Sequence, residues 1–385
     1  MKSRSSEASP NLSNQSLILR DPYLEWVERE GIPVVEDFGV NLLEVQTGPW
    51  ARIDALGAAV HLKGRGDFLS MFVVELKPGA ATSPQRHLYE ETIYVLSGNG
   101  NTTIVRPDGE KHSFEWGVGS LFAIPLNAAY QHFNASGIEN ARLVCSTTAP
   151  AALNMYHSEA FVFDNPWNFP ERIGQEKYFN GDGDYTPIRA GLNLWETNLV
   201  PDLTALKLTE WGERGAGSTN INLLMADSVM HVHTSEMPVG TYKKAHRHDP
   251  GAHVMCVTGK GYSLGWYKGE SDMIRVDWTH GVVFAPLSNM FHQHFNAGPK
   301  PSRYLATIFG SVRYPFLDNK RKLNEGAVDT DVKLGGNQIE YEDEERKVHE
   351  LYESELAKHG AECQMKGYIP WCTGKVGTMI WQGGE

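Results

Sequence analysis

The feature that most constrains the fold of this chain is an internal repeat. The stretch "ELKPGAATSPQRHLYEETIYVLSGNG" at 75–100 aligns without a gap with "EMPVGTYKKAHRHDPGAHVMCVTGKG" at 236–261. A second matched pair follows at nearly the same distance in each copy, "FAIPLNAAYQHFNASG" at 122–137 and "FAPLSNMFHQHFNAG" at 284–298. Two matched blocks in the same order indicate a tandem duplication, so the chain is expected to form two units of the same kind.

Each copy is predicted to consist of β-strands. Segments such as "TIYVLSG", "ARLVCSTT" and "HVMCVTG" are short, rich in Val, Ile, Thr and aromatic residues, and separated by Gly, Pro and Asn turns. Short strands at close spacing favour a sandwich or a barrel in each half. Helices are expected only near the ends, at 21–31 and at 340–360, where helix-start or densely charged residues precede a Gly.

This organisation predicts five regions. The connector between the repeats is rich in Gly, Pro and aromatic residues, which is typical of an ordered but irregular segment. The regions are an N-terminal segment with a short helix at 1–40, a first barrel at 41–163, a connector at 164–215, a second barrel at 216–320 and a C-terminal helical extension at 321–385.

Composition excludes several classes of partner. A net charge of -12 gives no support to nucleic-acid binding, because phosphate recognition needs a basic face. No apolar run approaches the roughly 18 to 20 residues of a membrane span, and the polar, Ser-rich N-terminus lacks the apolar core of a signal peptide. The four cysteines match neither a zinc ribbon nor a dense disulfide framework. We therefore expect a cytoplasmic protein with reduced thiols.

The second copy carries a cluster of histidines with the pattern of a metal site. His246 and His248 are two residues apart, and His292 comes from the second block. Residues i and i+2 of a strand point to the same side, so three imidazoles from two strands can form one face of a coordination shell and leave the other positions for substrate, oxygen or water. The alternative is a set of polar residues on the barrel wall, but three histidines at three matched positions favour metal binding.

The first copy has a reduced version of this cluster. At the aligned positions it carries Gln85, His87, Glu91 and Tyr130, so two imidazoles are missing. By strand parity His87 and Glu91 face inward, and His132 follows Tyr130 on the same face. The set His87, Glu91 and His132 could hold a weaker second metal or act as an acid–base cluster. The alternative is a copy that serves only as scaffold, with its polar groups bonded to one another.

The paired blocks resemble the two motifs of the cupin superfamily, G-x5-H-x-H-x3,4-E-x6-G and G-x5-P-x-G-x2-H-x3-N. Both copies fit this outline, so the chain resembles a bicupin. The resemblance implies a mainly all-β protein with two tandem cupin barrels of the double-stranded β-helix, or jelly-roll, type and short terminal helices. In the second copy Ala252 stands where the motif has Glu. A neutral three-His shell leaves a divalent ion its full charge, which favours a substrate that chelates through anionic oxygens.

The segments "AHRHDPGAHVMCVTGKG" and "FHQHFN" are similar to those of gentisate and salicylate 1,2-dioxygenases, bicupins that hold Fe(II) with three His and no Glu. The resemblance implies that His246, His248 and His292 are iron ligands, with Mn, Zn, Ni or Cu as alternative metals. It also makes His294 a candidate catalytic residue, and His253 is a candidate for substrate contact. One departure is that these dioxygenases keep their best-defined site in the first cupin, whereas here the complete set lies in the second.

Three classes of function are open at this stage. The expected one is an Fe(II)-dependent dioxygenase that cleaves a carbon–carbon bond of a small oxygenated, aromatic or phenolic, compound with O2. The second is a redox-neutral metal-dependent lyase, isomerase or hydrolase of a small carboxylate or keto compound. The third is a non-catalytic binding or storage bicupin, against which the intact three-His set argues. Because exposed strand edges need covering, a homo-oligomer is also expected.

Overall fold

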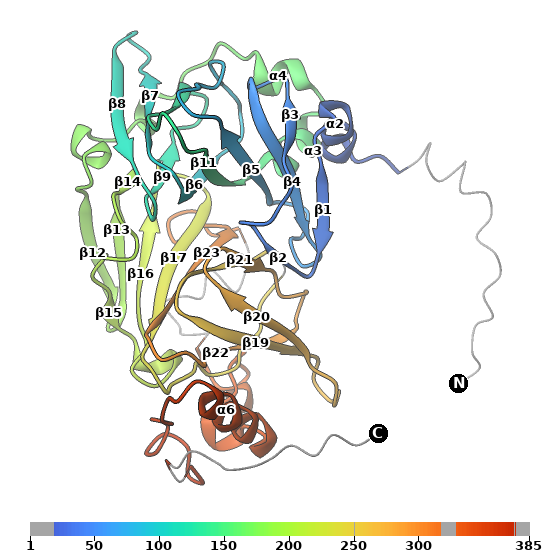
Figure 1. The fold of residues 1–385 in the computed structure, drawn as a ribbon, viewed down its shortest axis with the longest axis vertical. Helices are drawn as coiled ribbons and strands as arrows, with labels where there is room; N and C mark the ends of the chain where they lie inside the picture. The colour runs from blue at the N-terminus through green and yellow to red at the C-terminus, as the bar shows by residue number, and fades with distance from the viewer. Residues whose placement is uncertain (1–18, 250, 317–328, 373, 375–385) are drawn as a thin grey trace, which may run out of the picture.

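The computed structural model describes residues 19–249, 251–316, 329–372 and 374. Residues 1–18, from which the absence of a signal peptide was argued, lie outside this range. No helix in the described part is both long and apolar enough to cross a bilayer. Two β-barrels are stacked along the long axis of the molecule, the first at the top and the second below it in Figure 1. The predicted mainly-β fold with two tandem barrels is confirmed.

The first barrel consists of a large sheet of order β1-β4-β5-β11-β6-β9-β14, with β3 beside β4, and a three-stranded sheet of order β10-β7-β8. Its strands are β1 (Val34–Asp37), β3 (Gly48–Trp50), β4 (Ala55–Leu62), β5 (Ser70–Leu76), β6 (Glu91–Ser97), β7 (Gly100–Val105), β8 (Lys111–Trp116), β9 (Leu121–Ile124), β10 (Ala129–Asn134), β11 (Ala141–Thr147) and β14 (Leu199–Val200).

The second barrel has a large sheet of order β12-β13-β16-β17-β23-β18-β21-β2, with β15 beside β16, and a three-stranded sheet of order β20-β19-β22. Its strands are β2 (Gly39–Asn41), β12 (Asp184–Arg189), β13 (Leu192–Glu196), β15 (Thr209–Glu210), β16 (Thr219–Leu224), β17 (Met230–Met237), β18 (His253–Thr258), β19 (Lys260–Trp266), β20 (Ile274–Thr279), β21 (Val282–Phe284), β22 (Phe291–Asn296) and β23 (Ser302–Phe309).

The duplication extends further than the sequence blocks. Strand β1 pairs in parallel with β4, and β13 pairs in parallel with β16, which is the equivalent strand of the second copy. Strand β2 follows β1 of the first barrel in sequence but pairs with β21 of the second barrel. In the same way, β14 follows β13 of the second barrel but pairs with β9 of the first. Each repeat therefore begins earlier than predicted, and strands from 1–40 and 164–215 are parts of the two sheets. Strands β2 and β14, with three and two residues, carry too little periodicity to be found from sequence. The longer β12 and β13 lie in the segment that was assigned to the connector because of its Gly, Pro and aromatic residues.

The two large sheets pack against each other and share a hydrophobic core. Along β18, Val254 lies in the interior of the second barrel, whereas Met255 lies in the core shared with the first. Side chains of a strand alternate between its two faces. These strands are therefore buried on both faces, which explains their nearly continuous apolar runs.

Helices occur near both ends of the chain and, in sequence, between the two barrels. Helix α2 (Pro22–Glu30) begins at the N-cap Asp21 and ends at Gly31, as predicted. The expectation that helices are confined to the ends is wrong, because α3 (Ala149–Tyr156) and α4 (Glu159–Phe163) follow β11. Helix α3 has a proline in its first turn, and α4 has a Ser N-cap. Both are as apolar as the neighbouring strands, so they were not distinguished from strands in the sequence.

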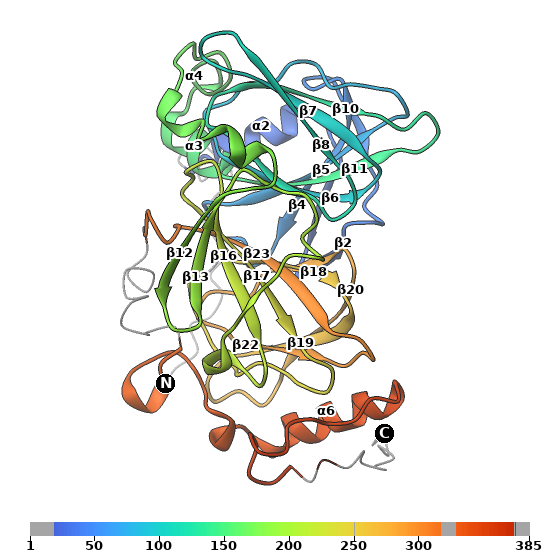
Figure 2. The same ribbon diagram turned by 90° about the vertical axis from the view of Figure 1, so that its left-hand side faces the viewer.

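Helix α6 (Arg346–Lys358) is shorter than the predicted span of 340–360, and 341–343 form a single 3-10 turn. It lies across the end of the second barrel that is remote from the first (Figure 2). The ring of Tyr352 packs edge-on against Tyr242, with 4.7 Å between the ring centroids. The helix thereby closes the hydrophobic core at this end of the barrel.

Candidate metal centre

The structure brings His246, His248 and His292 together. One ring nitrogen of each lies within 4.8 Å of the others, and the ring centroids of His246 and His292 are 4.2 Å apart. The segment that carries the first two is irregular rather than the regular strand assumed from its parity. It is held by a pair of backbone hydrogen bonds between His246 and His292, of 3.0 and 2.8 Å, which dock it onto β22.

Hydrogen bonds set the tautomers of two of these imidazoles. His292 Nδ1 donates to the Met290 carbonyl at 3.0 Å, and His248 Nδ1 donates to the Asp249 carbonyl at 2.7 Å. Both lone pairs are therefore at Nε2, as in most protein metal sites. Burial, together with neighbouring imidazoles and the Arg214 guanidinium, holds the pKa values of His246 and His292 well below the usual range. Both rings are neutral at pH 7, which is the form that binds a metal.

The donor set fits a divalent cation. His246 Nδ1 is buried without a hydrogen-bond partner in the described part of the chain. The first copy has Glu91 at the position of Ala252, and Ala252 lines the same pocket as the three histidines. No carboxylate or thiolate among the described residues joins this group. Three imidazole nitrogens and a methyl group in place of the carboxylate leave part of the coordination shell open toward the pocket.

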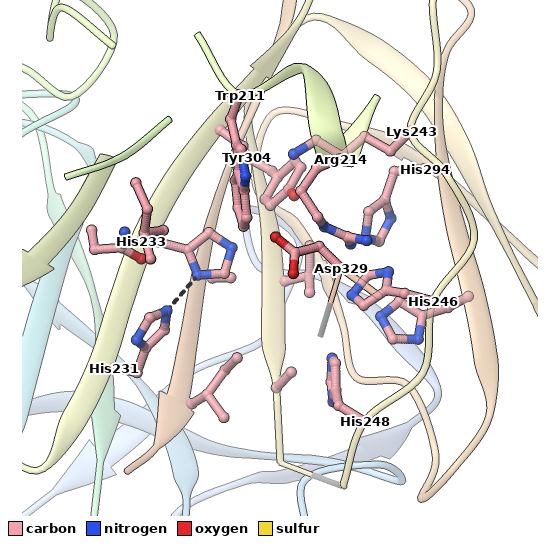
Figure 3. Close-up of a pocket in the computed structure, with 18 of the residues that line it drawn as sticks. Trp211, Arg214, His231, His233, Lys243, His246, His248, His294, Tyr304 and Asp329 are labelled. Carbon is pink, nitrogen blue, oxygen red and sulfur yellow. Dashed lines mark hydrogen bonds between the residues drawn. The ribbon is translucent and has the colours of Figure 1, made fainter. Parts of the chain in front are cut away.

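The pocket in front of the three histidines contains buried cations. Figure 3 shows Arg214 and Lys243 on the same side as His294 and His246, with Tyr304 beside them. The Lys243 ammonium lies 5.1 Å from the centre of the Tyr304 ring. In the described chain neither Arg214 nor Lys243 has a carboxylate within ion-pair distance. The cavity has a volume of about 90 Å³.

Burial and neighbouring charge change the proton affinities of this group. Burial lowers the pKa of Lys243, and the nearby Arg214 guanidinium lowers it further. Burial by itself would raise the pKa of Tyr304, but the Lys243 ammonium and Arg214 hold it below its ordinary value. The two pKa values therefore move toward each other, which suits a pair that exchanges a proton.

The opposite wall of the pocket is also polar. His231 Nε2 and His233 Nδ1 on β17 are 3.1 Å apart, as the dashed line in Figure 3 shows. Asp329 also lines the pocket, beside Arg214 and His246 in Figure 3, and forms a 2.5 Å ion pair with Arg189. These residues were not predicted from the sequence, although "HVH" at 231–233 has the same alternation as the predicted ligands. Lys243 could also have been singled out from the alignment of the two copies, because a charged residue stands there in the second copy and Thr82 in the first.

His294 lines the pocket, as the resemblance implied, but it belongs to a triad that both barrels contain. Its Nδ1 lies 2.8 Å from Ser263 Oγ, which accepts a 3.0 Å hydrogen bond from Trp278 Nε1. The first barrel repeats this arrangement with the residues His132, Thr102 and Trp116, at 2.8 and 3.0 Å. Because the triad is present in the copy without three matched imidazoles, its geometry is explained by packing between the two sheets of a barrel.

The structure places His253 outside the site. His253 is the first residue of β18, and its neighbours Ala252 and Val254 line the three-His pocket. Alternation therefore turns His253 to the other face, where it lines a small cavity between the barrels with Tyr94 and Met255. The sequence argument could not use parity here, because the residue follows a turn.

The first barrel does not assemble the ligand set His87, Glu91 and His132. The Tyr130 hydroxyl donates to Glu91 Oε2 at 2.9 Å and lies 2.9 Å from His87 Nε2. His132 instead bonds Thr102. Among the described residues, no group of three donors within 4.8 Å of one another occurs in this barrel. The arrangement is a satisfied hydrogen-bond cluster, as expected for a scaffold copy.

One family model and several solved structures are similar to this chain. Residues 72–147 of the first barrel match the family model of the cupin domain, and the second barrel repeats the strand order of the first. No curated protein matches the chain. Similar solved structures include two variants of oxalate decarboxylase from Bacillus subtilis. For one of them the identity is 15%, the TM-score is 0.46, and 72% of this chain and 78% of that chain are covered.

For the other variant the identity is 15%, the TM-score is 0.47 and the coverage is 73% and 78%. A third structure, from a study of the Mn(II) centres of the same Bacillus subtilis enzyme, has 16% identity, a TM-score of 0.45 and coverage of 72% and 78%. Identity this low transfers neither substrate nor metal to this chain.

Proposed function

We propose that the second barrel is a metal-dependent enzyme site, and that it is an Fe(II) dioxygenase that cleaves a carbon–carbon bond of a small anionic, oxygenated compound with O2. The observation that carries the proposal is the combination of three clustered imidazoles with the buried cations Arg214 and Lys243 in one pocket. Burying a guanidinium or an ammonium without a carboxylate within ion-pair distance costs roughly 3 to 5 kcal/mol for each group. A bound anionic substrate would supply the missing negative charge.

The size of the pocket favours a smaller substrate than the resemblance implied. Its volume is about 90 Å³, whereas an apolar cavity that binds benzene measures roughly 150 Å³. A substituted aromatic ring would need more space than this. A small carboxylate, keto or enolate compound fits both the volume and the charge, and it would chelate through its oxygens as expected for a three-His shell.

Each group of the site has a role in this proposal. His246, His248 and His292 would hold Fe(II), which when bound supplies a Lewis acid and a site for O2. Arg214 and Lys243 bind and orient the anionic end of the substrate and stabilise negative charge as it develops. The apolar residues that line the cavity, among them Leu192 and Ile308, exclude water.

The adjacent Lys243 and Tyr304 favour a second candidate, a redox-neutral lyase such as a decarboxylase. A reaction of this kind leaves a carbanion or enolate that must receive a proton. The Tyr304 hydroxyl, next to the Lys243 ammonium and in the same pocket as the imidazoles, can deliver that proton and be recharged by Lys243. This candidate needs no O2.

The test begins with metal content and then measures turnover. The purified protein is loaded anaerobically with Fe(II), and oxygen uptake is followed with small keto acids, hydroxy acids, diketones and hydroxybenzoates. We expect iron binding and oxygen uptake in the wild type and in His87→Ala, and loss of both in His248→Ala. Turnover without O2, supported equally by Mn or Zn, would replace the dioxygenase with the lyase. Absence of both metal binding and turnover would favour the non-catalytic alternative.

A further inference from the structure

We propose that the chain contains a second metal site, a closed zinc site formed by His349 and Glu353 of α6 together with Cys363 and Cys372. One donor atom of each of these four residues lies within 4.8 Å of the others. The site lies on the outer side of the second barrel, in the C-terminal segment beneath it in Figure 2. It is separate from the three-His pocket, and the proposal does not depend on the function of that pocket.

The distances between donor atoms match a tetrahedral zinc ion. The sulfur atoms of Cys363 and Cys372 are 3.6 Å apart, and His349 Nε2 is 3.2 Å from Glu353 Oε1. Cys372 Sγ is 3.9 Å from the same carboxylate oxygen. Zinc bonds of about 2.3 Å to sulfur and about 2.0 Å to nitrogen or oxygen require separations of roughly 3.8 Å for S–S, 3.3 Å for N–O and 3.5 Å for S–O. The observed separations agree within about 0.4 Å.

The hydrogen bonds of His349 leave a lone pair directed at this cluster. The Tyr242 hydroxyl donates to Glu344 Oε1 at 2.5 Å, so its oxygen accepts from His349 Nδ1 at 3.1 Å. The lone pair of the imidazole is then at Nε2, which is buried and forms no hydrogen bond with any described residue. The nearby Glu353 oxygen would repel this lone pair. A cation between the two removes the conflict and uses the imidazole as other metal sites do.

The surroundings indicate a structural site. His349, Cys363 and Cys372 are buried in the hydrophobic core beneath α6, and the four donors leave no position for water or substrate. Closed sites with four protein ligands stabilise folds rather than catalyse reactions. His349 and Glu353 are four residues apart and share one face of the helix. The cysteines come from the segment 361–372 that follows it, so zinc would fasten that segment to α6.

The segment that zinc would attach to α6 also contacts the second barrel. Gln364 N donates to the Gly240 carbonyl at 2.8 Å, so the segment after α6 is bonded to the loop that precedes His246. Tyr242, which bonds His349, is adjacent in sequence to the pocket residue Lys243. The site would therefore hold the outer layer against the strand and loop that carry the pocket cations.

Metal analysis of the full-length protein tests the site. His248→Ala removes the barrel ligand set, and the double variant Cys363→Ser/Cys372→Ser removes two of the four proposed ligands. Cys256→Ser is the matched control, because Cys256 is a buried cysteine outside the cluster. We expect about one zinc per chain in the His248→Ala protein and in Cys256→Ser combined with His248→Ala, and none in the double serine variant combined with His248→Ala.

A spectroscopic measurement keeps the test valid if the double variant does not fold. Replacement of zinc by Co(II) in the His248→Ala protein should give intense tetrahedral d–d bands and a thiolate-to-cobalt charge-transfer band. The unfolded, unreduced chain should titrate all 4 cysteines as thiols. No bound zinc and no thiolate band would overturn the proposal, and the loss of two titratable thiols would identify a Cys363–Cys372 disulfide in its place.

Discussion

Lys243 is a buried lysine in the three-His pocket, and its surroundings differ from those of the adjacent Lys244. Its side chain is among the largest that are fully inaccessible to solvent, and its charge is next to Tyr304 rather than a carboxylate. The following residue, Lys244, points away and forms an ion pair of 2.5 Å with Glu340. Two adjacent lysines therefore have different environments, and only the first is placed to contact a ligand.

This contrast gives a prediction for turnover. Lys243→Met should lower kcat/KM by roughly 10² to 10³, because it removes a preorganised positive charge from the pocket. Lys244→Met is the matched control and should leave turnover within about twofold. Steady-state kinetics and iron content measured on the same preparations check this. Equal activity of Lys243→Met and the wild type would show that the substrate does not contact this ammonium.

At the scale of secondary-structure elements, the attachment of α6 depends on a buried carboxyl group. Glu344, just before the helix, accepts hydrogen bonds of 2.5 Å from the Tyr242 hydroxyl and from Gln293 Nε2. Burial raises its pKa to about 7 in spite of these bonds. Tyr242 is itself titratable, and His349 is the titratable group on its other side.

The raised pKa predicts how stability depends on pH. In the unfolded chain Glu344 has its ordinary pKa of about 4.5, so the folded state binds the proton more tightly. Its contribution is complete below about pH 4.5 and is lost as the pH rises through about 7, a change of the order of 3 kcal/mol. Urea unfolding at pH 5 and pH 8 should show this loss in the wild type and a smaller one in Glu344→Gln. An equal loss of unfolding free energy between pH 5 and pH 8 in the two proteins would contradict the assignment of this effect to Glu344.

At the scale of the whole molecule, the two barrels are joined by an exchange of strands. The first barrel receives β14, which lies between β13 and β16 of the second in sequence, and the second barrel receives β2, which lies between β1 and β3 of the first. The large sheets also share one hydrophobic core. Without the other barrel, each large sheet would lack one of its strands, and its apolar outer face would be exposed to solvent.

The exchange predicts cooperative unfolding. In differential scanning calorimetry the two barrels should unfold in one transition, with a calorimetric enthalpy equal to the van't Hoff enthalpy. A fragment of residues 1–163 lacks β14 and exposes the shared core, so it should be aggregation-prone and lack a cooperative transition. Two separate transitions in the intact protein, or a stably folded 1–163 fragment, would show that the exchanged strands contribute little.

Much of this architecture could be predicted from the sequence because the two copies share a fold, so residues at matched positions of the alignment occupy equivalent places in the two barrels. The two blocks identified the repeat and the positions of three imidazoles, and the segments rich in Val, Ile and Thr predicted the strands β6, β11 and β18. The spacing of His246 and His248 pointed to the right residues, although the segment that carries them is irregular and is brought beside His292 by backbone hydrogen bonds to β22. The same argument failed for His253, which follows a turn where alternation restarts.

What the sequence by itself determined is therefore local: the repeat, the alternation of strand residues and the types of ligand at matched positions. The tertiary structure alone decided which distant residues meet. Arg214, Lys243 and Tyr304 are far apart in sequence, and only the closure of the barrel places them in one pocket. The same holds for His349 and Cys372, and for β2 and β14, because long-range contacts depend on how the chain closes on itself, and no local pattern records that.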